Sequence, residues 1–293
     1  MRFGLLGTGH WAAETQGAAL AVHPDVDFVG VWGRDPAKAE VIARRYGARA
    51  FGDADDLLAD VDAVAVALPP DVQAELAERA ANAGRHLLLD KPLALSVEAA
   101  DRVVAAVEAA GVASLVFFTS RFDPHVDIFV KEAAEEEWDG ARVTMFASIF
   151  QSGSPYATSP WRRDKGGLWD IGPHALAIVL PVLGPVDAVA AMDGLHGTTH
   201  VLLRHASGAV STLALTLDAP PAATMHEFVL YGPDGVVVMP ESDGTPVDAF
   251  GAAISQLVGD AAAGRRNHPC DVRFGREVVA ILDAAESARR AWT

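Results

Sequence analysis

The chain has 293 residues, of which 51% are hydrophobic and 21% are charged, a composition typical of a folded globular protein. Its formal net charge of −16 argues against nucleic acid or an anionic membrane as a partner, because both require clustered cations. Cys270 is the single cysteine, which excludes an intrachain disulfide and a cysteine-based metal site and favours a cytoplasmic protein. We expect no metal site.

Targeting and membrane segments are not expected either. No basic and apolar leader precedes the first apolar segment. The most apolar stretch, residues 175–192, is interrupted by Pro181, Pro185 and Asp187, and is therefore a poor membrane span.

The first 120 residues alternate strand-like and helical patterns. Strands are expected at residues 2–6, 27–32, 49–51, 63–67, 86–89 and 113–119. Helices are expected at residues 11–22, 36–46, 71–83 and 97–110, the last of them capped by Ser96. This alternation predicts an α/β domain with a doubly wound parallel sheet over residues 1–120.

The pattern changes in the rest of the chain, where strands follow one another. After a helix at 124–136, strands are expected at residues 141–150, 186–192, 199–205, 210–217, 227–231 and 236–239. Helices at residues 248–263 and 272–292 complete the chain. Residues 121–293 are therefore predicted to form an α+β domain with a large, mainly antiparallel open sheet.

A glycine pattern follows the first strand directly. Gly7, Gly9 and Ala12 form G-x-G-x-x-A at the start of a helix. Gly7 permits the tight turn, Gly9 lets a pyrophosphate approach the backbone, and Ala12 keeps the helix close to the sheet. The segment therefore predicts a dinucleotide site that also includes Thr8, His10 and Trp11; the alternative is a glycine turn without a ligand.

The end of the second strand bears on which dinucleotide binds. Gly33 stands where enzymes specific for NAD usually have an acidic residue on the ribose, and Arg34 follows it. A guanidinium without that carboxylate suits a 2′-phosphate, which favours NADP over NAD. Two alternatives stay open: Asp35 could turn toward the ribose, and Arg34 could stack on the adenine.

Two further segments carry candidate chemistry. Lys91 follows a strand end in Leu-Asp-Lys-Pro, where ligands of open α/β sheets bind, although it could be an ordinary surface lysine. Asp170 and His174 lie four residues apart in Gly-Gly-Leu-Trp-Asp-Ile-Gly-Pro-His, so they share one face if the segment is helical. A histidine beside a carboxylate can act as a general acid–base; the alternative is a capping aspartate and a structural histidine.

Taken together and in this order, these motifs resemble the Gfo/Idh/MocA family of nicotinamide-dependent oxidoreductases. Asp90-Lys91-Pro92 is similar to its Glu-Lys-Pro motif, and residues 166–174 are similar to its Gly-Gly-x-x-x-Asp-x-Gly-x-His motif. Further similar segments are Arg121-Phe122 with Pro124, Trp161-Arg162, and residues 268–275. The resemblance implies a Rossmann domain followed by a substrate-binding domain, assembled as a homodimer or homotetramer.

The resemblance also implies a reaction and the residues that perform it. The expected substrate is a secondary alcohol or ketone of a sugar-like, polyol or cyclic compound, with Lys91, Asp170 and His174 as catalytic residues. Cofactor contacts are expected from the residues named above and from Leu68, Pro69, Asp90 and Lys91. Substrate contacts are expected from Lys91, Arg121, Trp161, Arg162, Asp170 and His174, with Arg162 and Lys165 placed in a short loop.

Three residues depart from the family pattern. Asp90 replaces the usual Glu, Gln73 stands where many members have His, and Ala177 stands where many have Asp or Asn. Gln73 and Ala177 are expected to shape the pocket, and Ala177 leaves the substrate class open. Two other functions also stay open: a cofactor-assisted glycosidase, and a dinucleotide-sensing regulator without turnover.

Overall fold

The computed structural model describes residues 1–241 and 244–291, which form two compact units. Unit 1 comprises Met1–Asp123 and Asp243–Val279, and unit 2 comprises Pro124–Ser242 and Ala280–Thr293. The sequence-based division, with a single boundary at residue 120, instead places residues 243–279 in the second domain.

Aromatic contacts explain why the segment 243–279 packs with unit 1. Phe250 meets Phe117 edge to face, with ring centroids 4.9 Å apart, and Phe274 meets Phe118 in the same way at 5.4 Å. The backbone N–H of Val116 also donates to the carbonyl of Cys270 at 2.7 Å. These pairings lie far apart in the sequence, so no local pattern predicts them.

Unit 1 is built on a six-stranded parallel sheet in the order β3-β2-β1-β4-β5-β6, as predicted. This is the doubly wound order, in which the direction of winding reverses between β1 and β4. Most residues of β1, β4, β5 and β6 are buried, as expected of strands covered on both faces. Its strands are β1 (Arg2–Leu6), β2 (Asp27–Trp32), β3 (Arg49–Phe51), β4 (Ala63–Val66), β5 (His86–Asp90) and β6 (Ser114–Phe117).

The helices of unit 1 agree with the prediction except at one position. The helix α3 was not expected; Asp53 caps it by accepting from the N–H of Asp55, and Leu57 and Leu58 are its buried face. The first helix begins as expected but is wound as a π-helix in its middle. The helical elements are η1 (Ala12–Gly17), α1 (Ala18–Val22), α2 (Pro36–Tyr46), α3 (Ala54–Asp60), α4 (Pro70–Asn82), α5 (Val97–Ala110), η2 (Thr119–Phe122) and α9 (Pro246–Ala262).

Unit 2 contains a six-stranded mixed sheet in the order β12-β11-β7-β10-β9-β8. Only β7 and β10 pair in parallel; every other neighbouring pair is antiparallel, which confirms the predicted sheet type. The strands are β7 (Gly140–Phe146), β8 (Val186–Asp193), β9 (Thr199–His205), β10 (Val210–Thr216), β11 (Met225–Gly232) and β12 (Gly235–Val238).

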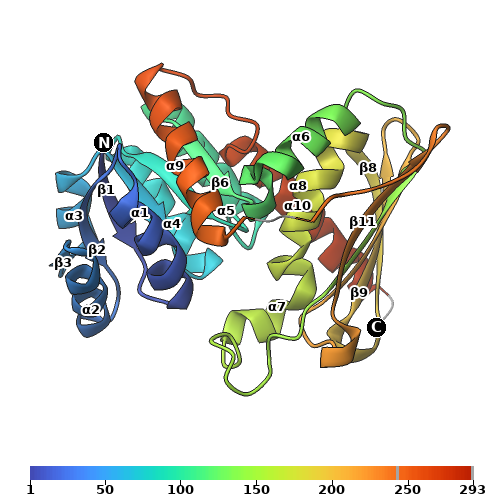
Figure 1. Cartoon of the computed structure of the whole chain (residues 1–293), viewed down its shortest axis with the longest axis horizontal. Coiled ribbons are helices and arrows are strands. Elements are labelled where there is room, and N and C mark those ends of the chain that lie inside the picture. The colour runs from blue at the N-terminus through green and yellow to red at the C-terminus, as the bar shows by residue number, and fades with distance from the viewer. Residues whose placement is uncertain (242–243, 292–293) are drawn as a thin grey trace. The chain divides into compact units, whose positions relative to one another are not determined.

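Two helices of unit 2 correct the prediction. The segment holding Arg162 and Lys165 is not a loop but the helix α7 (Pro160–Asp170), and α8 (Gly172–Leu183) follows it. Both helices contact β10. Figure 1 shows α8 beside the sheet of this unit. The other helices are α6 (Pro124–Ala133) and α10 (Val272–Arg290), of which the part up to Val279 belongs to unit 1 and the rest to unit 2. The predicted helix end at Trp292 lies outside the described residues.

One stretch of this unit, Pro160–Leu183, is long and apolar enough by length and composition to cross a membrane. Within that stretch, 83% of the apolar window is buried inside the structure. Because α8 packs against β7 and β10, this apolar character belongs to the core of unit 2.

Candidate active site

The parallel register of unit 1 aligns the segments that the sequence assigns to the cofactor. Leu6 pairs with Trp32 and with Val66, and Val66 pairs with Leu89. The loops after β1, β2, β4 and β5 therefore leave the sheet at one edge. These loops hold residues 7–10, Gly33 and Arg34, Leu68 and Pro69, and Lys91, while Asp90 ends β5.

The glycine loop has the backbone that the predicted turn requires. Gly7 has φ of 141°, and a Cβ there would lie 2.3 Å from the carbonyl oxygen of Ala67. A Cβ on Gly9 would meet no heavy atom within 4 Å, so the surface above it is open for a ligand to approach. Ala12 is fully buried, which holds the following helix close to the sheet. These residues fit a dinucleotide pyrophosphate.

A shallow groove of about 370 Å³ continues from this loop along α2. Val41, which is 66% exposed, gives the groove an apolar wall on which an adenine ring can lie. The groove is lined by Thr8, Gly9, His10, Ala13, Glu14, Ala37, Lys38, Val41, Ile42 and Arg45.

The end of β2 presents an exposed Arg34 and no free carboxylate. Asp35 caps α2, where its Oδ1 accepts from the backbone N–H groups of Ala37 at 3.0 Å and Lys38 at 3.3 Å. This cap occupies the carboxylate that could otherwise have turned toward a ribose. Gly33 is buried, whereas Arg34 is exposed to solvent.

The Lys91 segment is held by a buried glutamine. The Nε2 of Gln73 donates to the carbonyl oxygens of Asp90 at 2.7 Å and Pro92 at 3.0 Å, and its Oε1 accepts from the N–H of Asp90 at 2.9 Å. Gln73 is fully buried, and these hydrogen bonds fix the backbone on both sides of Lys91. The structure adds how Gln73 would shape the pocket: its amide bonds to the backbone on both sides of Lys91.

In unit 2, paired glycines bring α7 onto the sheet. Gly166 has φ of 65° and interrupts the helix, and a Cβ on Gly167 would lie 2.8 Å from the backbone of Thr216 in β10. The close approach buries Trp169 and Asp170 at the end of α7. The glycine pair thus places these two residues rather than a phosphate.

Arg162 and Asp170 form an ion pair within α7. The Nε of Arg162 lies 3.0 Å from an Oδ of Asp170, and the side chains are 20% and 8% exposed. The guanidinium also lies over the rings of Tyr156 and Trp161. Its central carbon, Cζ, is 4.5 Å from the centroid of each ring. Arg162 therefore holds a buried carboxylate, a role that the sequence does not reveal.

His174 is half-buried near the start of α8. Its backbone N–H donates to the carbonyl of Ile171, where α7 and α8 meet. Asp170 and His174 therefore flank a junction between two helices instead of sharing one uninterrupted helix. Ala177 is buried one turn further along α8, where a charged side chain would need a partner.

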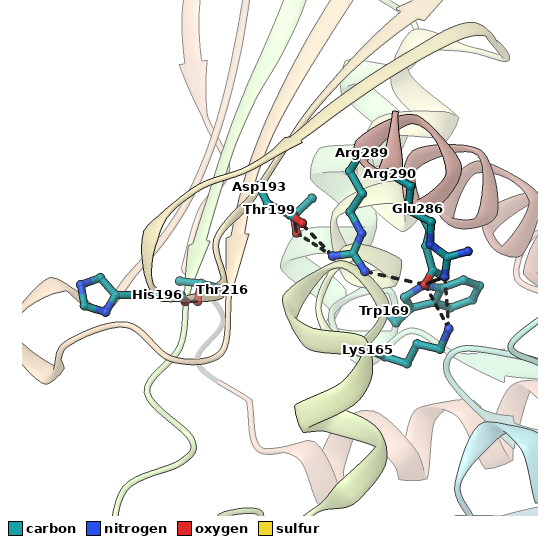
Figure 2. A network of polar contacts seen from close by, with 9 residues as sticks. All are labelled: Lys165, Trp169, Asp193, His196, Thr199, Thr216, Glu286, Arg289 and Arg290. Carbon is teal, nitrogen blue, oxygen red and sulfur yellow. Dashed lines mark hydrogen bonds and ion pairs between the residues drawn. The ribbon is translucent and has the colours of Figure 1, made fainter. Parts of the chain in front are cut away.

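A polar network anchors α7 to the C-terminal helix and to the β8–β9 connection (Figure 2). Glu286 of α10 accepts from Lys165 at 3.2 Å, from the indole N–H of Trp169 at 2.8 Å and from Arg290 at 2.7 Å. Arg289, the residue before Arg290, donates from its Nη1 to Oδ1 of Asp193 and to Oγ1 of Thr199, each at 3.4 Å. Lys165 is thus a structural residue of α7, and Glu286 is a buried anchor that the sequence analysis missed.

A separate hydrogen bond in the same region involves a residue with an uncommon backbone conformation. His196, in the connection between β8 and β9, has φ of 54°, which is uncommon outside glycine. The Thr216 hydroxyl donates to the His196 carbonyl at 2.6 Å and helps to hold this conformation (Figure 2).

We expect Glu286→Gln to destabilise the protein by about 2 to 3 kcal/mol, because it leaves Lys165 half-buried without a negative partner. Burial alone would raise the pKa of Glu286, but Lys165, Trp169 and Arg290 together hold it below the ordinary value of 4.5. Its ionisation therefore stabilises the fold above pH 4.5, and this contribution is lost as the pH falls through the lowered pKa.

Urea unfolding of the wild type and of Glu286→Gln, each at neutral and at acidic pH, measures the loss of stability and its dependence on pH. Asp283→Asn, an exposed position on the same helix, is the control and should change stability by less than about 0.5 kcal/mol. Equal stability of Glu286→Gln and the control would contradict the anchoring role.

The predicted site residues thus fall into two groups. The cofactor residues and Lys91 lie at one edge of the unit 1 sheet, and Arg121 is buried in η2 of the same unit. Trp161, Arg162, Asp170 and His174 lie together in α7 and α8 of unit 2. Among residues 1–241 and 244–291, no group of three or more His, Cys, Asp or Glu side chains is arranged to hold a metal ion.

Both parts of the chain match models of one protein family. Residues 1–118 match the oxidoreductase family with an NAD-binding Rossmann fold, GFO_IDH_MocA. Residues 130–238 match the GFO/IDH/MocA C-terminal domain.

Curated relatives and solved structures agree with these models. A dTDP-3,4-didehydro-2,6-dideoxy-alpha-D-glucose 3-reductase of Streptomyces antibioticus is 31% identical over 80% of this chain and 74% of its own. A D-xylose 1-dehydrogenase (NADP(+)) of Haloferax volcanii is 28% identical over 98% of both chains. The structure of a levoglucosan dehydrogenase with NADH and levoglucosan has a TM-score of 0.86 at 20% identity, covering 100% of this chain and 98% of that one, and so shows the fold. The chain therefore belongs to the Gfo/Idh/MocA family of oxidoreductases and begins with its NAD-binding Rossmann domain.

Proposed function

We propose that the protein is an NAD(P)-dependent dehydrogenase or reductase that interconverts a secondary hydroxyl and a ketone on a sugar-like, polyol or cyclic substrate. The observation that carries the proposal is the sheet edge of unit 1, where the glycine loop and the clamped Lys91 follow aligned strand ends. The relatives named above act, by their names, on a dTDP-linked sugar and on D-xylose, which is the same substrate class.

In this proposal two side chains act on the reacting oxygen, and a third, Asp170, supports them. A bound nicotinamide supplies or accepts the hydride. His174 takes the hydroxyl proton in the oxidative direction and returns it in the reverse direction. Lys91 donates to the same oxygen and stabilises its developing negative charge. Asp170 orients Lys91 or His174, or holds a neighbouring hydroxyl; its ion pair with Arg162 fixes the position of the carboxylate that this role needs.

We also propose that the cofactor is NADP rather than NAD. Arg34 is exposed at the end of β2, and Gly33 has no carboxylate. The carboxylate of Asp35 caps α2 instead of facing the ribose position. A guanidinium without an acidic neighbour binds a 2′-phosphate well, because it presents a fork of donors to the phosphate oxygens. The Haloferax volcanii relative, named for NADP(+), supports the same choice.

Thermal unfolding with NADP, with NAD and without nucleotide tests this proposal. We expect NADP to raise the melting temperature more than NAD, and Arg34→Met to remove most of that difference. Arg44→Met is the matched control, because Arg44 lies on α2 outside the groove and pairs with Glu40. A larger shift with NAD would overturn the role of Arg34, and no shift with either nucleotide would overturn the cofactor itself.

The proposed enzyme is a cytoplasmic homodimer or homotetramer that associates through the open face of the unit 2 sheet. Apolar side chains exposed on that sheet support an interface: Val236 at 67%, Val238 at 58%, and Met192, Met225 and Leu202 at about half. Light scattering of the purified chain would detect the assembly, and a monomer would contradict it.

A further inference from the structure

The glycine loop and the end of β2 come close together at Thr8 and Gly33. The parallel pairing of β1 with β2 sets Leu6 beside Trp32, and the N–H of Gly7 donates to the carbonyl of Trp32 at 2.9 Å. The next residue of each segment is therefore brought close to the other.

Space, rather than backbone conformation, requires glycine at position 33. Gly33 is not among the glycines with positive φ, so its backbone suits any residue. A Cβ there would lie 2.4 Å from Cγ2 and 2.9 Å from Oγ1 of Thr8, closer than van der Waals contact permits. The Thr8 side chain thus fills the volume where a side chain at position 33 would begin.

We propose that Thr8 is a specificity-determining residue for the cofactor, because its side chain sterically excludes an acidic residue from position 33. The inference rests on the proposed cofactor site and deepens it. With glycine at position 33, no carboxylate there repels a 2′-phosphate. The guanidinium of Arg34, the next residue, can then attract the phosphate. Thr8 and Gly33 act as a coupled pair: a carboxylate at 33 becomes useful only when residue 8 is smaller.

The coupling predicts how four variants bind nucleotide in calorimetric titrations. Gly33→Asp alone should weaken NADP binding at least about tenfold, through charge repulsion and the clash, without a matching gain for NAD. Combining it with Thr8→Ala removes the two closest contacts and leaves only the Thr8 Cβ at 3.2 Å. This double variant should favour NAD over NADP, moving the ratio of the two affinities about 100-fold from that of the wild type, because the carboxylate can then accept from the ribose hydroxyls. Thr8→Ala alone is the reference for the comparison.

Thr8→Val with Gly33→Asp is the matched control, because valine keeps the branched volume and removes only the hydroxyl. It should behave like Gly33→Asp alone. If Gly33→Asp alone, or together with Thr8→Val, gains NAD binding as fully as the Thr8→Ala combination, the steric coupling is wrong. If the Thr8→Ala combination folds but gains no NAD affinity, the specificity role is overturned.

A second measurement needs no nucleotide and separates the coupling from the cofactor proposal. Gly33→Ala should lower the melting temperature of the wild type by several degrees, and much less in a Thr8→Ala background. Equal losses in the two backgrounds would overturn the coupling. If the wild type binds neither nucleotide while the two losses differ, the proposed cofactor fails and with it the specificity role, whereas the steric contact stands.

Discussion

Replacing Lys91 with methionine is expected to lower turnover about 100-fold or more while weakening the affinity for the dinucleotide far less. Methionine keeps most of the aliphatic stem but removes the ammonium group that is proposed to stabilise charge on the reacting oxygen. The backbone at this position should remain in place, because Gln73 holds it through Asp90 and Pro92 rather than through the lysine side chain.

The measurement is steady-state turnover, followed by the absorbance of the reduced nicotinamide, with a substrate found by screening sugars and polyols. Lys131→Met is the control, because Lys131 is an exposed lysine of α6 paired with Asp127. Its turnover should equal that of the wild type. Wild-type turnover in Lys91→Met would remove Lys91 from the mechanism, and release of sugar without net reduction would indicate a cofactor-assisted glycosidase instead.

The fold of unit 1 could be predicted because its signals are local. Strands buried on both faces appear as continuous apolar runs, and the caps Asp35 and Ser96 mark where α2 and α5 begin. The packing of residues 244–279 with this unit depends on contacts of Phe250 with Phe117 and of Phe274 with Phe118, which are over 130 positions apart in the sequence. No periodicity along the chain reports such contacts.

In unit 2 one local prediction was wrong, because the segment with Arg162 and Lys165 was expected to be a loop and forms α7. The close approach of Gly167 to the backbone of β10, which places this helix on the sheet, is a contact distant in the sequence. The motif identified Asp170 and His174 as candidate catalytic residues. It did not identify the side chains that fix α7 in place, such as Glu286. Glu286 lies 121 residues from Lys165, so only the folded chain brings the anchor to the motif.

The ion pair between Arg162 and Asp170 leads to the last prediction. Arg162→Met should destabilise the protein by about 3 kcal/mol, because it removes a cation that lies 3.0 Å from a carboxylate that is only 8% exposed. The same change removes the positive charge beside Asp170, so turnover should fall as well, because the carboxylate is no longer held in place by the guanidinium. Arg162→Lys keeps the charge but loses the planar contact with Tyr156 and Trp161, so it should recover only part of the loss.

Arg163→Met provides a matched control one residue away. Arg163 is exposed, donates to the carbonyl of Ala157 and lies over the ring of Phe150, but its bonds do not include Asp170. Its removal should cost less than about 1 kcal/mol. Urea unfolding and steady-state kinetics distinguish the two roles of Arg162. A variant of normal stability that only raises KM would show that Arg162 binds substrate directly. A loss of stability together with a lower kcat would show that it acts through Asp170, as the buried ion pair requires.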